Sequence, residues 1–266
     1  MLDRFDRNIN YLRISVTDRC NLRCSYCMPA EGIKLLKHSD ILTFDEITAF
    51  CRVAIDYGVT KVRLTGGEPL VRRGITALVR MLSDLNGISD LSMTTNGILL
   101  KDFAMELKNA GLHRINISLD TVDAEKFTEI TRGGNIADVF KGINAARDAG
   151  LLPVKINCVF RESKDEPEAK GVTEFCEQNN LEIRYIRQMD LVRGHFSTVE
   201  GGTGGDCGLC NRLRLTANGK LKPCLFDDLE FDVRKLGFEK AFMNAVNLKP
   251  ECGSVNNKGA FYNIGG

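Results

Sequence analysis

Three cysteines near the start of the chain have the spacing of an iron–sulfur site. Cys20, Cys24 and Cys27 form a C-x3-C-x2-C pattern directly after an alternating segment over residues 11–17. Cysteine thiolates are the usual ligands of a [4Fe–4S] cluster, which contains four irons. Three thiolates leave one iron without a protein ligand, and a small molecule can coordinate and react at such an open position.

Two other uses of these cysteines fit the sequence less well. A zinc site usually needs four ligands in paired knuckles, and no fourth cysteine or histidine lies nearby. A disulfide is not expected in a chain without a secretory signal. The pattern therefore predicts a cluster with an open iron.

A second group, Cys207, Cys210 and Cys224, has the spacing C-x2-C-x13-C. A zinc ribbon would need a fourth ligand, for which Cys252 or a distant histidine stays open, whereas three thiolates again favour a cluster with an open iron. The alternating segment over residues 212–216 places two arginines beside this group. They would suit a substrate that carries phosphates, although solvated arginines on a surface strand are the commoner case.

Composition narrows the class of protein. The chain has 266 residues, a hydrophobic content of 43% and a formal net charge of +1. These values are typical of a globular protein and indicate neither a nucleic-acid partner nor a membrane. No apolar run approaches 18 residues, and no signal sequence is visible, so we expect a cytoplasmic protein. The scattered Cys51, Cys158 and Cys176 are expected to be packed core residues, and Cys252 receives no role.

Strand and helix patterns alternate over the first 190 residues. Strands are expected at 11–17, 60–65, 90–95, 113–118, 153–159 and 182–187, with helices at about 43–57, 74–85, 100–110, 136–149 and 166–178. Repeated β-α units imply a parallel sheet, and six strands imply an α/β fold of the partial (β/α)6 barrel type. We expect this barrel over residues 1–190. A glycine-rich connection, a hairpin over 212–226, a helix near 238–246 and a polar tail would occupy residues 191–266.

The strands alternate between apolar and polar side chains. Arg13, Arg63, Thr94, Asn116 and Lys155 all fall on the polar faces of their strands. Since helices must cover the apolar faces, the polar faces should point inward and line a cavity for a polar ligand. A half-exposed sheet with ordinary alternation is the alternative.

The segment Thr65-Gly-Gly-Glu-Pro69 follows the second predicted strand. Adjacent glycines allow the backbone to approach a ligand closely, and Glu68 could accept a hydrogen bond from an ammonium group. A strand-end Gly-Gly pair alone is a common turn.

Several segments together resemble the radical S-adenosylmethionine (SAM) enzymes and, among them, the GTP 3′,8-cyclase (MoaA) family of molybdenum cofactor biosynthesis. The resemblance covers nearly the whole chain. Its segments are Leu12-Arg-Ile-Ser-Val-Thr-Asp-Arg-Cys-Asn21, Cys24-Ser-Tyr-Cys-Met-Pro29, Arg63-Leu-Thr-Gly-Gly-Glu-Pro-Leu70, Thr94-Thr-Asn-Gly97, Cys210-Asn-Arg-Leu-Arg-Leu-Thr216, Leu221-Lys-Pro-Cys-Leu-Phe226 and Ile264-Gly-Gly266.

The resemblance implies a role for each matching residue. Cys20, Cys24 and Cys27 would hold the SAM cluster, and Cys207, Cys210 and Cys224 a second [4Fe–4S] cluster whose open iron binds guanine. The residues implied to contact SAM are Tyr26, Gly67, Glu68, Ser118 and Met189. Those implied to contact GTP are Arg13, Arg63, Thr94, Lys155, Arg184, Arg212, Leu213 and Arg214. The first three cysteines, with Arg212 and Arg214, would be the catalytic residues, and the tail Gly265–Gly266 would reach into the active site.

The implied reaction is a radical cyclisation. A 5′-deoxyadenosyl radical would take the ribose 3′ hydrogen of GTP, and the carbon radical would attack C8 of guanine. The product would be 3′,8-cyclo-7,8-dihydro-GTP, the first intermediate of molybdopterin biosynthesis. The implied partners are an electron donor and the downstream cyclic pyranopterin synthase, and the family also allows a homodimer.

The chain departs from this family in length. It is several dozen residues shorter than expected, and the missing part falls between the sixth strand and Cys207, where the glycine-rich connection stands. The sixth strand also ends in Ile186-Arg-Gln-Met-Asp190, where an acidic residue and an aromatic are usual. Two alternatives therefore stay open: a related enzyme that acts on another substrate, such as a peptide, and a non-catalytic iron–sulfur protein.

Overall fold

The computed structural model describes residues 1–258 and Ile264. The predicted role of Gly265–Gly266 lies outside the described residues. Nine strands form one sheet in the order β6-β5-β4-β3-β2-β1-β7-β8-β9. The strands are β1 Tyr11–Ser15, β2 Lys61–Thr65, β3 Asp90–Thr95, β4 Arg114–Ser118, β5 Lys155–Phe160, β6 Glu182–Arg187, β7 Arg212–Leu215, β8 Lys220–Lys222 and β9 Phe231–Asp232.

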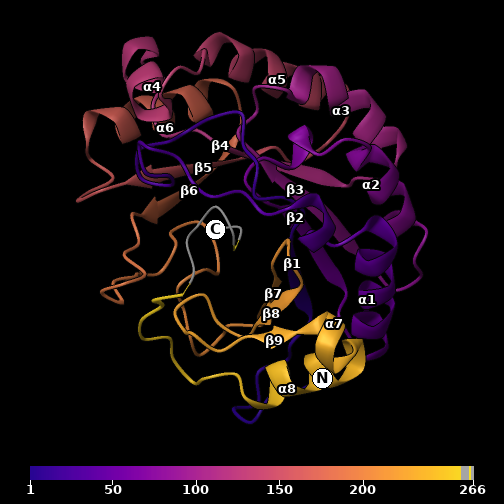
Figure 1. Ribbon diagram of the computed structural model, residues 1–266. Coiled ribbons are helices and arrows are strands. Elements are labelled where there is room, and N and C mark those ends of the chain that lie inside the picture. The colour runs from indigo at the N-terminus through magenta and orange to yellow at the C-terminus, as the bar shows by residue number, and fades with distance from the viewer. Residues whose placement is uncertain (259–263, 265–266) are drawn as a thin grey trace.

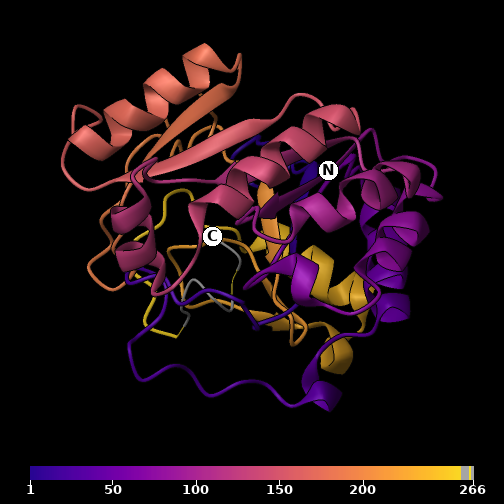
Figure 2. The same ribbon diagram turned by 90° about the horizontal axis from the view of Figure 1, so that it is seen from above.

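Helices cover the outer side of the curved sheet (Figure 1). In the view from above, the purple and magenta helices again lie outside the sheet, and the orange and yellow C-terminal loops lie within its curve (Figure 2). The α-helices are α1 Phe44–Asp56, α2 Ile75–Ser83, α3 Leu100–Asn109, α4 Ala124–Thr131, α5 Ile136–Asp148, α6 Pro167–Gln178, α7 Val233–Leu236 and α8 Phe238–Asn247. Two short 3-10 helices are η1 His38–Asp40 and η2 Pro69–Val71.

Strands β1 to β6 pair in parallel, as the β-α alternation predicts. Their apolar side chains, such as Leu12, Leu64 and Ile117, are fully buried in the main core beneath the helices. The polar residues between them therefore face the inner side of the curve. This confirms the partial α/β barrel and the orientation of its polar faces.

Capping residues and glycines mark where the helices begin and end. Thr43 accepts a hydrogen bond from Glu46 N at 3.1 Å, and Glu46 Oε2 accepts one from Thr43 N at 2.7 Å, which completes a capping box at the start of α1. Gly58, Gly111 and Gly150 follow helices with positive φ. The short helix α4 was not predicted, because its residues are largely polar. Asp123 caps it by accepting from Lys126 N at 2.8 Å.

The C-terminal strands continue the barrel sheet. β7 pairs in parallel with β1, and β7, β8 and β9 form an antiparallel meander that includes the predicted hairpin. The sheet therefore runs across the boundary expected near residue 190, and the division into two domains stays a prediction.

The glycine-rich connection after β6 is folded back on the sheet edge. Tyr185 N donates to Glu200 O at 3.0 Å, and Val199 N donates to Gly204 O at 2.7 Å. Gly205 has φ +79°, and a Cβ there would lie 2.0 Å from Ser197 O, so only glycine fits. Among the described residues, no helix has both the length and the apolar composition needed to cross a bilayer.

Candidate functional site

A cavity of about 320 Å³ opens on the inner face of the sheet. Its walls bring together the polar strand residues, the glycine-rich connection and the second cysteine group. The predicted site residues that line it are Arg13, Arg63, Arg184, Met189, Arg212, Arg214, Cys207, Cys210 and Cys224.

Cationic side chains dominate the cavity wall, which carries Arg13, Lys61, Arg63, Arg114, Arg184, Arg212 and Arg214. Burial lowers the pKa of Arg63 to about 10, and the pKa of Arg13 falls well below its usual range through burial and the charge of Arg214. These shifts mean that the guanidiniums are poorly solvated and close to like charges. A ligand with several negative charges would compensate the lost solvation of the guanidiniums and reduce the repulsion between them.

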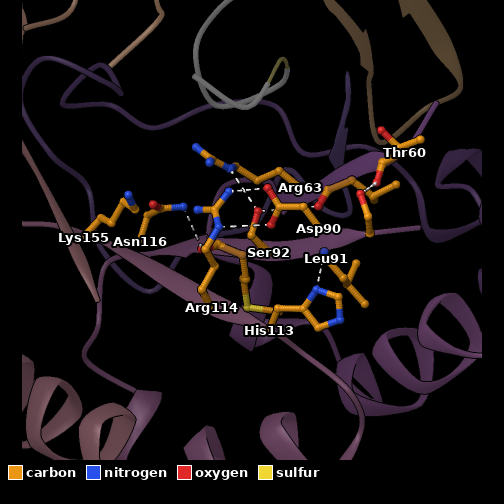
Figure 3. A network of polar contacts seen from close by, with 12 residues as sticks. Thr60, Arg63, Asp90, Leu91, Ser92, His113, Arg114, Asn116 and Lys155 are labelled. Carbon is orange, nitrogen blue, oxygen red and sulfur yellow. Dashed lines mark hydrogen bonds and ion pairs between the residues drawn. The ribbon is translucent and has the colours of Figure 1, made fainter. Parts of the chain in front are cut away.

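Hydrogen bonds fix part of this wall in place. Arg114 donates to Asp90 through two bonds of 3.0 and 2.6 Å, and Arg63 Nε donates to Ser92 Oγ at 3.3 Å. Figure 3 shows Arg63, Asp90 and Arg114 together on one side of the sheet. Neither Arg114 nor Lys61 was predicted to belong to the site, although Lys61 shares the polar face of Arg63. Asp90 is their acidic neighbour in the cavity wall.

Three residues that were predicted to contact GTP are not among those that line the cavity. Lys155 Nζ forms an ion pair with Glu182. Leu213 is fully buried in the core, so its side chain faces away from the cavity. The hydroxyl of Thr94 is buried and, in the described part of the chain, has no hydrogen-bond partner. An unsatisfied buried hydroxyl is costly unless a ligand completes it, and this fits a polar ligand next to β3.

The first cysteine group lies on one loop after β1. Cys24 O accepts from Cys27 N and Met28 N, each at 3.0 Å, and Ser25 N donates to Ile130 O at 2.9 Å. Burial and the neighbouring thiols raise the pKa of Cys24 to about 12 and that of Cys27 to about 11. These thiols therefore need a bound cation to ionise, as the iron of a cluster provides.

Tyr26, one of the residues expected to contact SAM, lies on this loop and is anchored by Asp120, whereas Met189 lines the cavity beside the second cysteine group. Tyr26 donates to Asp120 Oδ2 at 2.7 Å, and Asp120 Oδ1 accepts from Val159 N at 2.8 Å, which fixes the aromatic ring near the end of β4 and Ser118. This role of Asp120 was not predicted.

Glu68 and Gly67 have structural contacts of their own. Glu68 is buried and accepts hydrogen bonds from Leu70 N, Thr95 Oγ1 and Asn96 N at 3.0, 2.7 and 2.7 Å. Burial nevertheless raises its pKa to about 7. A Cβ at Gly67 would lie 2.3 Å from Arg19 O. The Gly-Gly pair therefore allows a close approach to the chain just before Cys20.

Two buried cations support the second cysteine group. Lys249 Nζ donates to Arg212 O at 2.9 Å and to Pro223 O at 2.5 Å, which joins the residues that follow Cys210 and precede Cys224. Arg7 donates to Cys207 O at 2.8 Å. Neither residue was predicted, because both lie far along the chain from the cysteines that they support.

The local charges also differ from those of the first group. Burial raises the pKa of Cys210, but the charges of Lys249 and Arg212 and a backbone N–H lower it by more, so the net shift is downward. In the described part of the chain, no three His, Cys, Asp or Glu side chains converge on a single metal ion. A [4Fe–4S] cluster does not need such convergence, because each thiolate binds a different iron.

Comparisons with known proteins identify the class. The family model described as the radical SAM superfamily matches residues 14–171. The fold is similar to Streptococcus suis SuiB bound to its precursor peptide SuiA, with a TM-score of 0.67 and 17% identity over 92% of this chain and 66% of that one. It is also similar to anSMEcpe with bound AdoMet, with a TM-score of 0.61 and 14% identity over 91% of this chain and 81% of that one. The chain is a radical SAM enzyme, and this class implies a [4Fe–4S] cluster and SAM.

Curated relatives define the family within this class. A GTP 3′,8-cyclase of Thermodesulfovibrio yellowstonii is 40% identical over an alignment of 312 positions, gaps included, that covers 97% of each chain. One from Moorella thermoacetica is 41% identical over an alignment of 303 positions that covers 94% of each chain. The chain belongs to the GTP 3′,8-cyclase family. With 266 residues against an alignment of 312, it lacks several dozen positions of its relatives, as expected.

Proposed function

We propose that the protein converts GTP to 3′,8-cyclo-7,8-dihydro-GTP, the first step of molybdopterin biosynthesis. The observation that carries this proposal is the cavity, whose wall has seven cationic side chains beside three cysteines of the second group. The cations suit a triphosphate, and an open iron on the cysteines would suit a ring nitrogen or oxygen of guanine.

In this proposal, each residue has a role that follows from its place in the cavity. Arg63, Arg114 and Arg184, with Arg13, bind and orient the triphosphate. Arg212 and Arg214 lie on β7 between these arginines and the second cysteine group, so they hold the nucleotide near that group. The Thr94 hydroxyl donates a hydrogen bond to the bound GTP. The glycine-rich connection contributes Phe196 and Val199 to the cavity wall.

Two cofactor sites belong to this proposal. Cys20, Cys24 and Cys27 hold the cluster that binds SAM, with Tyr26, Gly67, Ser118 and Met189 around the SAM molecule and Glu68 supporting the site. When bound, this cluster and SAM supply the 5′-deoxyadenosyl radical. Cys207, Cys210 and Cys224 hold a second [4Fe–4S] cluster. An external electron donor, the downstream pyranopterin synthase and a cytoplasmic location complete the proposal.

A peptide substrate is the second candidate, because the fold is similar to SuiB in complex with a precursor peptide. That similarity concerns the fold alone. The buried arginines are a poor environment for an uncharged peptide backbone, since their charges would remain uncompensated.

The test is nucleotide-dependent SAM cleavage. Anaerobically reconstituted protein is incubated with SAM and dithionite, and 5′-deoxyadenosine is measured with GTP, with ATP and without nucleotide. GTP should stimulate its formation at least about 10-fold, which corresponds to about 1.4 kcal/mol. Arg63→Met should abolish the stimulation, whereas Arg52→Met, outside the cavity, should keep it. Equal formation with and without GTP would point to another substrate, and no formation would favour a non-catalytic protein.

A further inference from the structure

Cys252 is the cysteine for which the cluster sites leave no role. Its Sγ lies 3.2 Å from the Sγ of Cys207. Cys252 is exposed, whereas Cys207 is half-buried and lines the cavity. The two thiols therefore meet at the outer edge of the second cysteine group, and small molecules in solution can reach one of them.

A buried guanidinium holds both cysteine segments together. Arg7 Nη1 donates to Cys207 O and to Glu251 O, each at 2.8 Å, and Nη2 donates to Pro250 O at 2.7 Å. Asp3 accepts from Arg7 Nε at 2.7 Å and neutralises its charge. One side chain thus fixes the backbone of Cys207 and the two residues that precede Cys252.

The residues on the other side of Cys252 are fixed as well. Ser254 N donates to Phe226 O at 2.8 Å. A Cβ at Gly253 would lie 2.6 Å from Phe226 Cβ and 3.1 Å from Cys224 Sγ, so the segment passes directly against the second cysteine group. Cys252 therefore belongs to an anchored segment, and its contact with Cys207 is a property of the fold.

We propose that Cys207 and Cys252 form a reversible disulfide in the cluster-free protein, with a low-molecular-weight disulfide as the oxidant. The inference rests on the proposed function in one respect, that Cys207 is a ligand of the second cluster. Oxidation of the pair removes that ligand, so the second cluster can be inserted only into reduced protein.

The chemistry proceeds in two exchanges. The Cys252 thiolate attacks one sulfur of the small disulfide, which forms a mixed disulfide at Cys252 and releases one thiolate. The Cys207 thiolate then attacks the Cys252 sulfur, which forms the Cys207–Cys252 bond and releases the second thiolate. The two protein thiols lose two electrons to the small disulfide, and their two protons pass to the two released thiolates, which become thiols.

The geometry favours this bond over a fourth metal ligand at Cys252. The separation of 3.2 Å is shorter than the roughly 3.8 Å between two thiolates on one tetrahedral metal with bonds of about 2.3 Å. Thiolates on separate irons of a cluster lie further apart still. Cys252 also lies outside the residues that line the cavity, where an open iron would meet a substrate.

The first test maps the disulfide in the full cluster-free chain, without SAM or GTP. The protein is equilibrated anaerobically with glutathione mixtures from fully reduced to fully oxidised, free thiols are alkylated, and a non-reducing digest is analysed by mass spectrometry. A peptide pair linking Cys207 to Cys252 should appear in most of the oxidised protein and be absent from Cys252→Ser. Glutathione retained on Cys252 without this link, or a dominant link from Cys207 to Cys210 or Cys224, would overturn the proposal.

The second test measures cluster insertion. Oxidised and reduced chains receive clusters from a loaded scaffold protein without added thiol, and iron is counted. The oxidised wild type should hold about four irons fewer than the reduced one, and Cys252→Ser should hold the same number in both states. Fewer irons in Cys252→Ser than in reduced wild type would make Cys252 a ligand and contradict the proposal. Because neither test uses GTP, failure of the proposed cyclisation would leave both results unaffected.

Discussion

The two cysteine groups are held in different ways. The first sits on one short loop, and its contacts come mainly from backbone atoms of that loop and of α4. The second spans two strands and their loops and is supported by Arg7 from one end of the chain and Lys249 from near the other. The first site is thus a local motif, whereas the second depends on contacts between segments that are far apart in the sequence.

The charges around the two groups differ at one cysteine. Burial raises the pKa of Cys24, Cys27 and Cys224, whereas neighbouring cations lower the pKa of Cys210. The comparison teaches that cations of the protein favour the thiolate at Cys210, whereas burial opposes it at Cys24, Cys27 and Cys224, where a bound metal would have to favour it.

Cysteine substitutions should separate the groups most strongly. Cys24→Ser should reduce SAM cleavage by at least about 1000-fold, because the radical cannot form without the first cluster. Cys224→Ser should keep about four of about eight irons and retain some SAM cleavage, but lose the cyclised product. Iron analysis and quantification of 5′-deoxyadenosine and product check both variants. Loss of all iron in Cys224→Ser would show that the two groups are not independent.

Lys249→Met should weaken the second site alone. The substitution leaves Arg212 O and Pro223 O without their donor, and loss of such supporting bonds typically lowers metal affinity about 10-fold to 100-fold. The rate at which a chelator removes iron from each cluster measures the effect. Lys222→Met is the matched control, because Lys222 is equally buried but faces Glu230 at 3.8 Å. Equal cluster loss in the two variants would contradict the assigned role of Lys249.

Arg234 should affect the stability of the fold and neither cluster site. It donates to Glu46 through two bonds of 2.7 and 2.8 Å and joins α7 to α1. The bond from Arg234 lowers the pKa of Glu46 from 4.5 to about 2. Since the pKa of this acid is depressed in the folded state, its contribution is complete above pH 4.5 and is lost as the pH falls towards 2.

Arg234→Ala should therefore cost about 1 kcal/mol of unfolding free energy at pH 7, because both side chains are partly solvated. The difference from wild type should shrink as the pH falls below 4.5. Urea unfolding between pH 7 and pH 3 tests this, with the exposed Arg52→Ala on α1 as the control. A difference that stays constant with pH would show that the ion pair is not the source.

The sequence predicts the barrel and the first site well, because both depend on short-range patterns. Period-2 alternation and capping signals such as Thr43 and Glu46 locate β1 to β6 and five helices within about two residues. The role of Glu68 as a hydrogen-bond acceptor for β3 could not be predicted, because it depends on strand adjacency. The same holds for Arg7 and Lys249, whose partners lie in distant segments. Lys61 and Arg114 could have been assigned to the cavity from their polar strand faces.

The most direct test of the central claim follows one hydrogen atom. The protein with both clusters is incubated with SAM, dithionite and GTP deuterated at the ribose 3′ carbon, and 5′-deoxyadenosine is analysed by mass spectrometry. If the cavity holds GTP as proposed, 5′-deoxyadenosine should carry one deuterium and form together with the cyclised nucleotide. Unlabelled 5′-deoxyadenosine and unchanged GTP would contradict the assignment of this short chain as an active GTP cyclase.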